Sequence, residues 1–179
     1  MLTQERLKEL LRYRKSTGVW TWKTVKGRTK GKESVAGCVT KSGGYRYIGV
    51  DGKLFQSSRL AFLYVLGYFP EHDVDHRNKI RHDDKWNNLR HATRSCNLKN
   101  CKAHKDNISG VKGVSLNKKT SKWEVKIRLN GKTKYLGLYE DFIEAVAIRF
   151  TVEQCSDWLD CDLNSSSGNA LKEYLKAER

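Results

Sequence analysis

Four side chains near the middle of this sequence carry the groups that metal-assisted hydrolysis needs. Asp75 and His76 are adjacent, and Asn88 and Asn97 follow along the chain. A neutral imidazole is available near pH 7, so His76 is a candidate general base. Carboxylate and amide oxygens are ligands that Mg²⁺ accepts, which makes Asp75 and Asn97 candidate metal ligands. Asn88 is a candidate orienting residue, because one side-chain amide can bond two backbone groups and hold a loop.

These side chains need a rigid frame, and their spacing fits an antiparallel hairpin that leads into a short helix. Residues 75–76 would end the first strand, and residues 89–90 would lie on the second. Thr93 or Ser95 would cap the helix, so that Asn97 can face the hairpin.

Each of these residues also has an interpretation without chemistry. Asp75 could form a salt bridge with Arg77 or Arg90. Asn88 could be an ordinary turn residue, and Asn97 could be a solvated helix position. The ordered set as a whole is a much stronger signal than an isolated Asp-His pair.

A zinc site is the other metal centre to consider, because Cys96, Cys101 and His104 lie close together in the sequence. Structural zinc takes four ligands, usually in paired short spacings, and this chain offers three and no Cys-x-x-Cys pair. We therefore expect Mg²⁺, or another hard divalent ion such as Mn²⁺, and no zinc.

The ordered set resembles the HNH (ββα-metal) endonucleases. The resemblance rests on Val74-Asp75-His76-x-Asn78, Asp83-Asp84, Asn88-Leu89-Arg90 and Ala92-Thr93-x-x-x-Asn97. It matches the homing-type subgroup, in which asparagine replaces histidine at the third motif position, and residues 44–62 are similar to the N-terminal part of phage HNH proteins. The resemblance implies that His76 and Asn88 are catalytic, as general base and structural asparagine. It also implies that Asp75 and Asn97 hold one Mg²⁺-type ion and that the products carry 5′-phosphate and 3′-hydroxyl ends.

The charge of the chain is strongly uneven. The net charge is +15, and all of the excess lies in residues 1–139, since residues 140–179 are net acidic. A long basic body points to a polyanionic partner, with binding that weakens steeply as salt is added. Within the motif we expect Arg77, Arg90 and Arg94 to contact DNA. The alternative is a basic protein with no nucleic-acid role.

Residues 111–155 have the pattern of a second unit. Residues 111–116 and 132–139 read as strands, and residues 123–129 alternate apolar and polar side chains. Asn130-Gly131 is a hairpin turn, and residues 142–155 have apolar side chains at helical spacing. We therefore expect a three-stranded antiparallel sheet with one packed helix and an open, basic face.

This second pattern is similar to an AP2 domain. The residues that carry the similarity are Ser109 to Val114, Lys122 to Arg128, Asn130-Gly131-Lys132, Tyr135 to Tyr139 and Glu144-Ala145. In that family a three-stranded sheet enters the major groove of DNA, which such a sheet fits. The resemblance implies DNA contacts by Trp123, Lys126, Arg128, Lys132 and Lys134.

We therefore expect an α+β protein with an HNH core and an AP2-like sheet. The expected division is a basic N-terminal region (1–70), a catalytic core (71–104), a DNA-binding domain (105–155) and an acidic tail (156–179). In the first region we expect a helix capped by Thr3, a tight turn at Asp51-Gly52, and a helix over residues 59–66. Ser57 or Ser58 would cap that second helix, and Gly67 would end it.

The expected function is metal-dependent cleavage of double-stranded DNA by a free-standing phage enzyme. The alternative is a non-catalytic regulator that binds specific DNA through the AP2-like sheet, and an RNA-directed nuclease stays open. No apolar run has membrane-spanning length and no secretory signal is present, so we expect a cytoplasmic protein, in the host cell if phage-encoded. Monomer or dimer, and nicking or double-strand cleavage, are left open.

Overall fold

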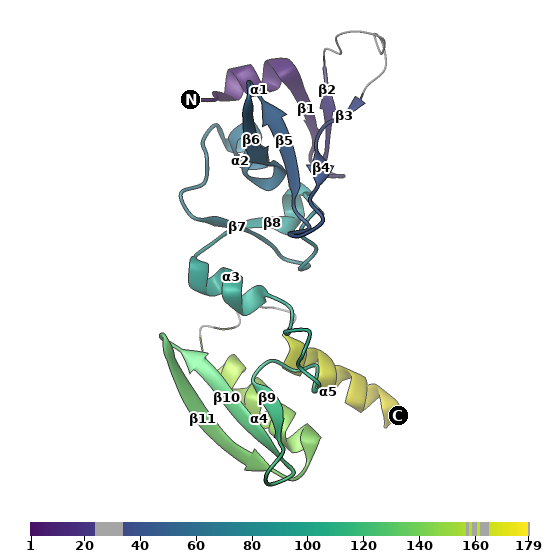
Figure 1. Ribbon diagram of the computed structural model, residues 1–179, viewed down its shortest axis with the longest axis vertical. Helices are drawn as coiled ribbons and strands as arrows, with labels where there is room; N and C mark the ends of the chain where they lie inside the picture. Colours follow the sequence, from purple (N-terminus) through teal and green to yellow (C-terminus); the bar gives the residue numbers. More distant parts are fainter. Residues whose placement is uncertain (24–33, 157, 159–160, 162–164, 179) are drawn as a thin grey trace. The chain divides into compact units, whose positions relative to one another are not determined.

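The computed structural model describes residues 1–23, 34–156, 158, 161 and 165–178. The chain divides into two compact units, residues 1–97 and residues 98–179, whereas the sequence suggested a boundary between 104 and 105. Each unit combines helices with small antiparallel sheets, which confirms the predicted α+β class (Figure 1). Within the described ranges, no helix has the length and apolar character needed to cross a membrane.

The described residues of unit 1 form three small sheets, with strand orders β1-β2-β3, β4-β5-β6 and β7-β8. Its elements, in chain order, are α1 (Gln4–Leu10), β1 (Leu11–Arg14), β2 (Val19–Trp22), β3 (Ser34–Val35), β4 (Cys38–Val39), β5 (Arg46–Val50), β6 (Lys53–Gln56), α2 (Ser57–Leu66), β7 (Asp73–His76), the 3-10 helix η1 (Trp86–Asn88), β8 (Leu89–Ala92) and α3 (Arg94–Asn100), which runs across the unit boundary.

Most of the expected local signals in unit 1 are present. Thr3 caps α1 by accepting a 3.2 Å hydrogen bond from the Arg6 N–H. Asp51 and Gly52 both have positive φ, as the tight turn between β5 and β6 requires. Gly67 ends α2 in the left-handed conformation. The predicted serine cap of α2 is wrong: Gln56 is the N-cap residue and makes no side-chain cap bond.

One hydrophobic core joins the N-terminal region to the β7–β8 hairpin. Trp20 is fully buried and stacks on Tyr13 with 4.7 Å between ring centroids. Val74 of β7 and Leu89 of β8 belong to the same cluster of buried side chains. The sequence suggested 1–70 and 71–104 as separate segments. The first region and the hairpin of the second therefore pack into one core.

Unit 2 has the predicted three-stranded antiparallel sheet with a packed helix. The strands are β9 (Val114–Asn117), β10 (Lys122–Leu129) and β11 (Lys132–Tyr139), in the order β11-β10-β9. Helix α4 (Phe142–Gln154) is capped by Asp141 and packs on the sheet. A further helix, α5 (Ser166–Ala177), packs against α4 within the segment predicted as an acidic tail.

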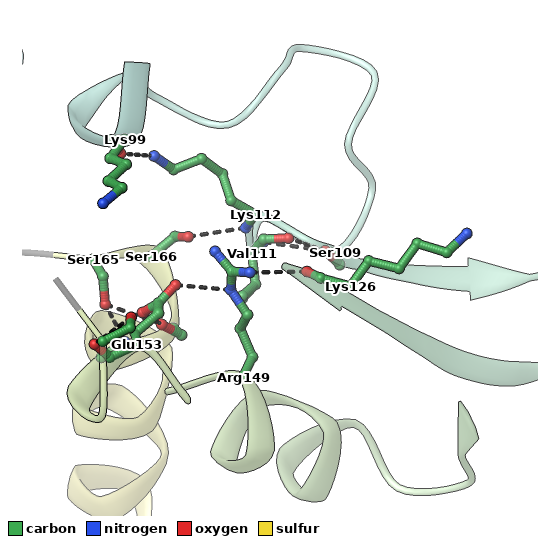
Figure 2. Close-up of polar contacts among 12 residues, drawn as sticks. Lys99, Ser109, Val111, Lys112, Lys126, Arg149, Glu153, Ser165 and Ser166 are labelled. Atoms are coloured by element: carbon green, nitrogen blue, oxygen red, sulfur yellow. Dashed lines mark hydrogen bonds and ion pairs between the residues drawn. The ribbon is translucent and has the colours of Figure 1, made fainter. Parts of the chain in front are cut away.

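A buried ion pair holds α4 to its neighbours in unit 2. Arg149 and Glu153 lie one helical turn apart, each 2% exposed, with 2.8 Å between Arg149 Nε and Glu153 Oε1. Arg149 also donates to the Lys126 carbonyl of β10, and Ser167 of α5 donates to Glu153 (Figure 2). The Lys126 side chain extends away from this network. The polar contacts therefore fix the sheet, α4 and α5 together.

Candidate active site

The β7–β8 hairpin followed by α3 positions the residues of the motif (Figure 1). In the hairpin, Asp75 pairs with Arg90 and His76 pairs with Leu89. Successive strand residues point to opposite faces, so Asp75 lies on the face that Asp73 shares, and His76 lies on the face of Val74 and the core. The ββα order agrees with the predicted frame.

His76 is held on the core side by a buried carboxylate. Its Nε2 atom lies 3.0 Å from Oδ1 of Asp84, and the two side chains are only 4% and 2% exposed. The other oxygen of Asp84 accepts a 2.5 Å hydrogen bond from the hydroxyl of Ser57, at the start of α2. The ring of Tyr45 lies 6.0 Å from the His76 ring. The candidate base thus has a fixed orientation.

Asn88 makes the contacts expected of an amide that holds a loop. Its Nδ2 atom donates to the Asp83 carbonyl at 2.6 Å and to the side chain of Asn78 at 3.0 Å. Its Oδ1 atom accepts from the backbone N–H of Asn78 at 3.0 Å. The single amide therefore bonds backbone groups at both ends of the loop between β7 and η1.

One candidate metal ligand, Asp75, lies on the face of the hairpin toward α3, and the other, Asn97, lies on α3 itself. Oδ2 of Asp75 is 2.9 Å from Nε and 2.8 Å from Nη2 of Arg90, so the salt bridge considered as an alternative is present. Asn97 donates from Nδ2 to Oδ2 of Asp73 at 3.0 Å. This bond, with the nearby guanidinium of Arg94, holds the pKa of Asp73 below its ordinary value.

Asp75 and Asn97 carry the kind of oxygen donors that a hard divalent ion accepts. Asp75 brings carboxylate oxygens and Asn97 brings an amide oxygen, and the bond from its nitrogen to Asp73 fixes the orientation of that amide. Among the described residues, no group of three or more His, Cys, Asp and Glu side chains forms a metal cluster. A pair of oxygen ligands suits Mg²⁺, which usually keeps several waters and takes substrate oxygens.

The arginines predicted to contact DNA near the motif differ in their surroundings. Arg77 is exposed in the loop that follows β7. The side chain of Arg94 is 77% exposed and lies 3.4 Å from Asp73. The side chain of Arg90 is only 11% exposed and is occupied by Asp75, which favours an internal ion pair over a phosphate contact.

The predicted DNA contacts of unit 2 divide between the two faces of its sheet. Directly opposed residues of antiparallel strands share a face. Ile127 is buried and opposes Lys134, and Leu129 opposes Lys132, so both lysines lie on the face toward α4. The faces of the other three predicted contacts follow from the residues that lie next to them.

Two of those remaining contacts lie on the open face and one does not. Lys126 opposes Tyr135 on the open face, and Arg128 is exposed on the same face of β10. Trp123 lies on the covered face, where its ring is 4.7 Å from the ring of Phe142. This tryptophan supports the core of unit 2, in contrast to the predicted DNA contact.

Three residues near His76 were missed by reasoning from the sequence. Asp84 was part of the motif pattern but had no role, and Ser57 was interpreted as a helix cap. Tyr45 lies in the segment 44–62, which resembles phage HNH proteins, but it had no role of its own; the guanidinium of Arg81 lies 5.2 Å over its ring. The adjacent acidic pair at 83–84 was the one available signal.

Comparison with known proteins supports the assignment of this region. Neither the curated proteins nor the solved structures gave a match. Residues 56–99 match the family model described as HNH endonuclease, and this segment includes α2, the β7–β8 hairpin and most of α3. The match supports an HNH nuclease domain that acts on DNA in residues 56–99.

Proposed function

We propose that this protein is a free-standing, phage-type homing endonuclease that hydrolyses double-stranded DNA with the help of Mg²⁺. The observation that carries the proposal is the arrangement of Asp75, His76, Asn88 and Asn97 on one hairpin and the helix that follows it. A protein that only binds DNA has no need of a buried histidine held by a carboxylate, an amide that fixes the adjoining loop, and two hard oxygen donors.

The chain's own residues would divide the reaction between them. His76 takes a proton from the attacking water, which approaches the phosphorus in line with the departing 3′ oxygen. Asn88 keeps the loop after β7 in place, so that His76 does not move during the reaction. Asp75 and Asn97 hold the ion, which when bound stabilises negative charge on the phosphate and on the leaving oxygen. The products carry 5′-phosphate and 3′-hydroxyl ends.

Unit 2 would bind the DNA in the manner of an AP2 domain. Its sheet has an open face with exposed Lys126 and Arg128, and a two- or three-stranded sheet fits the major groove. Arg128 is the better candidate for reading a guanine edge, because its guanidinium can donate two parallel hydrogen bonds. Lys132 and Lys134, on the other face, are better placed for phosphate contacts than for the base contacts of the open face.

A single catalytic set cuts one strand at a time, so cleavage of both strands would require a dimer or two successive events. As a proposal, we place the enzyme in the cytoplasm of the host cell, where it would meet its DNA substrate. The alternative function is a DNA-binding regulator that acts through the sheet of unit 2.

The test separates metal binding from cleavage. Wild type, Asp75→Ala and His76→Ala are incubated with end-labelled duplex DNA and Mn²⁺, and bound Mn²⁺ is measured by electron paramagnetic resonance. We expect wild type to bind the ion and cut, His76→Ala to bind the ion without cutting, and Asp75→Ala to do neither. Wild-type protein that binds DNA but never cuts it with Mg²⁺ or Mn²⁺ would refute the proposal and favour the regulator.

A further inference from the structure

The most unusual feature around the site is a carboxylate buried between a histidine and a serine. Asp84 is 2% exposed, and its two oxygens are engaged on opposite sides, one with Nε2 of His76 and one with the hydroxyl of Ser57. A buried ionised carboxylate costs several kcal/mol of desolvation unless its oxygens are hydrogen-bonded, so an arrangement of this kind is maintained by specific contacts. Neither Asp84 nor Ser57 belongs to the set Asp75, His76, Asn88 and Asn97.

The contact determines which nitrogen of His76 can accept a proton. An ionised carboxylate can only accept hydrogen bonds, so beside an ionised Asp84 the hydrogen of the neutral His76 ring lies on Nε2. In the neutral ring the lone pair is then on Nδ1. The carboxylate also stabilises the positive charge that the ring acquires when it takes a proton, as the aspartate of a Ser-His-Asp triad does.

Segments outside residues 56–99 fix the backbone on which Asp84 lies. The hydroxyl of Tyr13 in β1 donates a 2.6 Å hydrogen bond to the Asp84 carbonyl. The N–H of Trp86 donates to the carbonyl of Lys15 at 2.9 Å. Gly18 has a φ of +72°, and a Cβ atom added there would lie 2.4 Å from the carbonyl carbon of Asp84. The β1–β2 hairpin therefore packs directly on the segment that holds the carboxylate.

We propose that Asp84 is a positioning residue for the nuclease reaction, which holds His76 in the form with the hydrogen on Nε2, so that Nδ1 is the nitrogen that takes the proton. Ser57 and the β1–β2 hairpin hold Asp84 in turn. The inference rests on the proposed function, because a positioning residue needs a reaction to serve. It also gives the N-terminal region a role in catalysis, although that region contains no residue of the catalytic motif.

The first test needs no metal, and it uses a variant only to assign the signal. Nitrogen-15 NMR of histidine-labelled wild-type protein reports which ring nitrogen of His76 carries the hydrogen, and the His76 signal is assigned with His76→Ala. We expect the Nε2–H form. A hydrogen on Nδ1 would overturn the proposal, whether or not the protein cuts DNA. Failure to cut DNA, with Nε2–H observed, would instead count against the proposed function alone.

The second test uses Asp84→Asn, which keeps the shape of the side chain and removes its charge. We expect kcat to fall about 10²- to 10⁴-fold, the range for a general base and its orienting carboxylate, with DNA affinity within about twofold of wild type. The His76 nitrogen signals should shift as well. A kcat within about threefold of wild type in a folded variant would overturn the proposal.

Two further variants guard against loss of folding and against a general charge effect. Ser57→Ala removes one hydrogen bond to Asp84, and we expect a fall in kcat of about threefold to tenfold. Asp106→Asn is the matched control, because Asp106 forms an exposed pair with His104 at 3.2 Å, with both side chains 74% exposed. If Ser57→Ala changes neither kcat nor the His76 signals, Asp84 does not depend on Ser57 and the proposed chain of contacts is refuted.

Discussion

Arg90 holds Asp75 across the β7–β8 hairpin, with two of its guanidinium nitrogens 2.8 and 2.9 Å from one carboxylate oxygen. The two side chains are 11% and 6% exposed, so the pair is largely shielded from water. Since Asp75 is also the candidate carboxylate ligand, the guanidinium compensates its charge when no ion is bound. A divalent ion and Arg90 would then share, or compete for, the same carboxylate.

This relationship predicts how Arg90→Met responds to Mg²⁺. Without metal, the variant removes the guanidinium that is bonded to the buried carboxylate of Asp75, which costs about 3–5 kcal/mol of unfolding free energy. Mg²⁺ can replace the lost positive charge, so it should raise the melting temperature of Arg90→Met more than that of wild type. The measurement is thermal unfolding with and without Mg²⁺. Equal Mg²⁺-induced shifts in the two proteins would show that Asp75 is not a ligand.

Asn88→Ala should disorder the loop between β7 and η1. The change leaves the Asn78 N–H and the Asp83 carbonyl without their partner, at a cost of about 1–3 kcal/mol in urea unfolding. The cleavage rate should fall by more than the loss of folded protein explains, because His76 adjoins this loop. Asn87→Ala is the matched control, since Asn87 is exposed in the same 3-10 helix. Equal effects of the two variants on cleavage and on unfolding would mean that the loop contacts of Asn88 do not hold the site in place.

The two faces of the unit 2 sheet should contribute differently to DNA binding. We expect the double change Lys126→Ala and Arg128→Ala to weaken DNA binding, and each of these side chains that contacts a phosphate should account for about 1 in the slope of log K against log salt. Sequence preference should also relax if Arg128 reads a base. The comparison is Lys132→Ala with Lys134→Ala, which should affect affinity but leave sequence preference intact. If the Lys132 and Lys134 changes relaxed sequence preference and the Lys126 and Arg128 changes did not, the DNA would lie on the face of the sheet toward α4.

Ionisation of Tyr13 should lower the unfolding free energy of unit 1 in strong alkali. Burial, followed by the charges of Asp84 and Asp83, raises the pKa of Tyr13 above its ordinary value. A raised folded-state pKa means that stability is complete below the unfolded value, about 10, and is lost as the pH rises through the folded value. Wild type should therefore lose stability from about pH 10 upward.

Tyr13→Phe tests this alkaline loss. The variant lacks the hydrogen bond to the Asp84 carbonyl, so it should be about 1 kcal/mol less stable near neutral pH. Above pH 10 the difference should shrink, because phenylalanine does not ionise. Urea midpoints across this range provide the measurement, with Tyr68→Phe as the control at an exposed ring. Parallel curves for wild type and Tyr13→Phe would contradict the role of burial.

The hairpin, α3 and the three strands of unit 2 could be predicted because local signals agree with them. Positive φ at Asn130 and Gly131, the cap at Asp141 and the alternation in β10 all act over a few residues. The loop contacts of Asn88 were likewise expected, since they span only the turn that the motif encloses.

The environment of His76 could not be predicted from the sequence. The partner of Asp84 on α2 is 27 residues away along the chain, and the hydroxyl of Tyr13 is 71 residues away. Contacts of this range depend on how the core packs, which no local pattern encodes. The serine that had been interpreted as a cap therefore turned out to face the carboxylate.

The register of the second half of β11 was also beyond the sequence pattern. The pairing of β10 with β11 shifts by one residue between Val125 and Lys126. The Asn130-Gly131 turn fixes Leu129 opposite Lys132, so without the bulge Gly137 would oppose Glu124 on the open face; with it, Gly137 opposes the buried Val125. A one-residue change of register moves a side chain to the other face, and simple alternation gives no sign of it.

Cleavage of supercoiled plasmid by wild type and by His76→Ala, each with Mg²⁺ and with EDTA, tests the central claim most directly. The account predicts that wild type with Mg²⁺ converts the plasmid to nicked or linear DNA. It also predicts that EDTA or the His76→Ala change abolishes conversion while DNA is still bound. A wild-type protein that shifts the plasmid on a gel but leaves it supercoiled with every divalent ion would contradict the account, as would a folded His76→Ala that cuts at the wild-type rate.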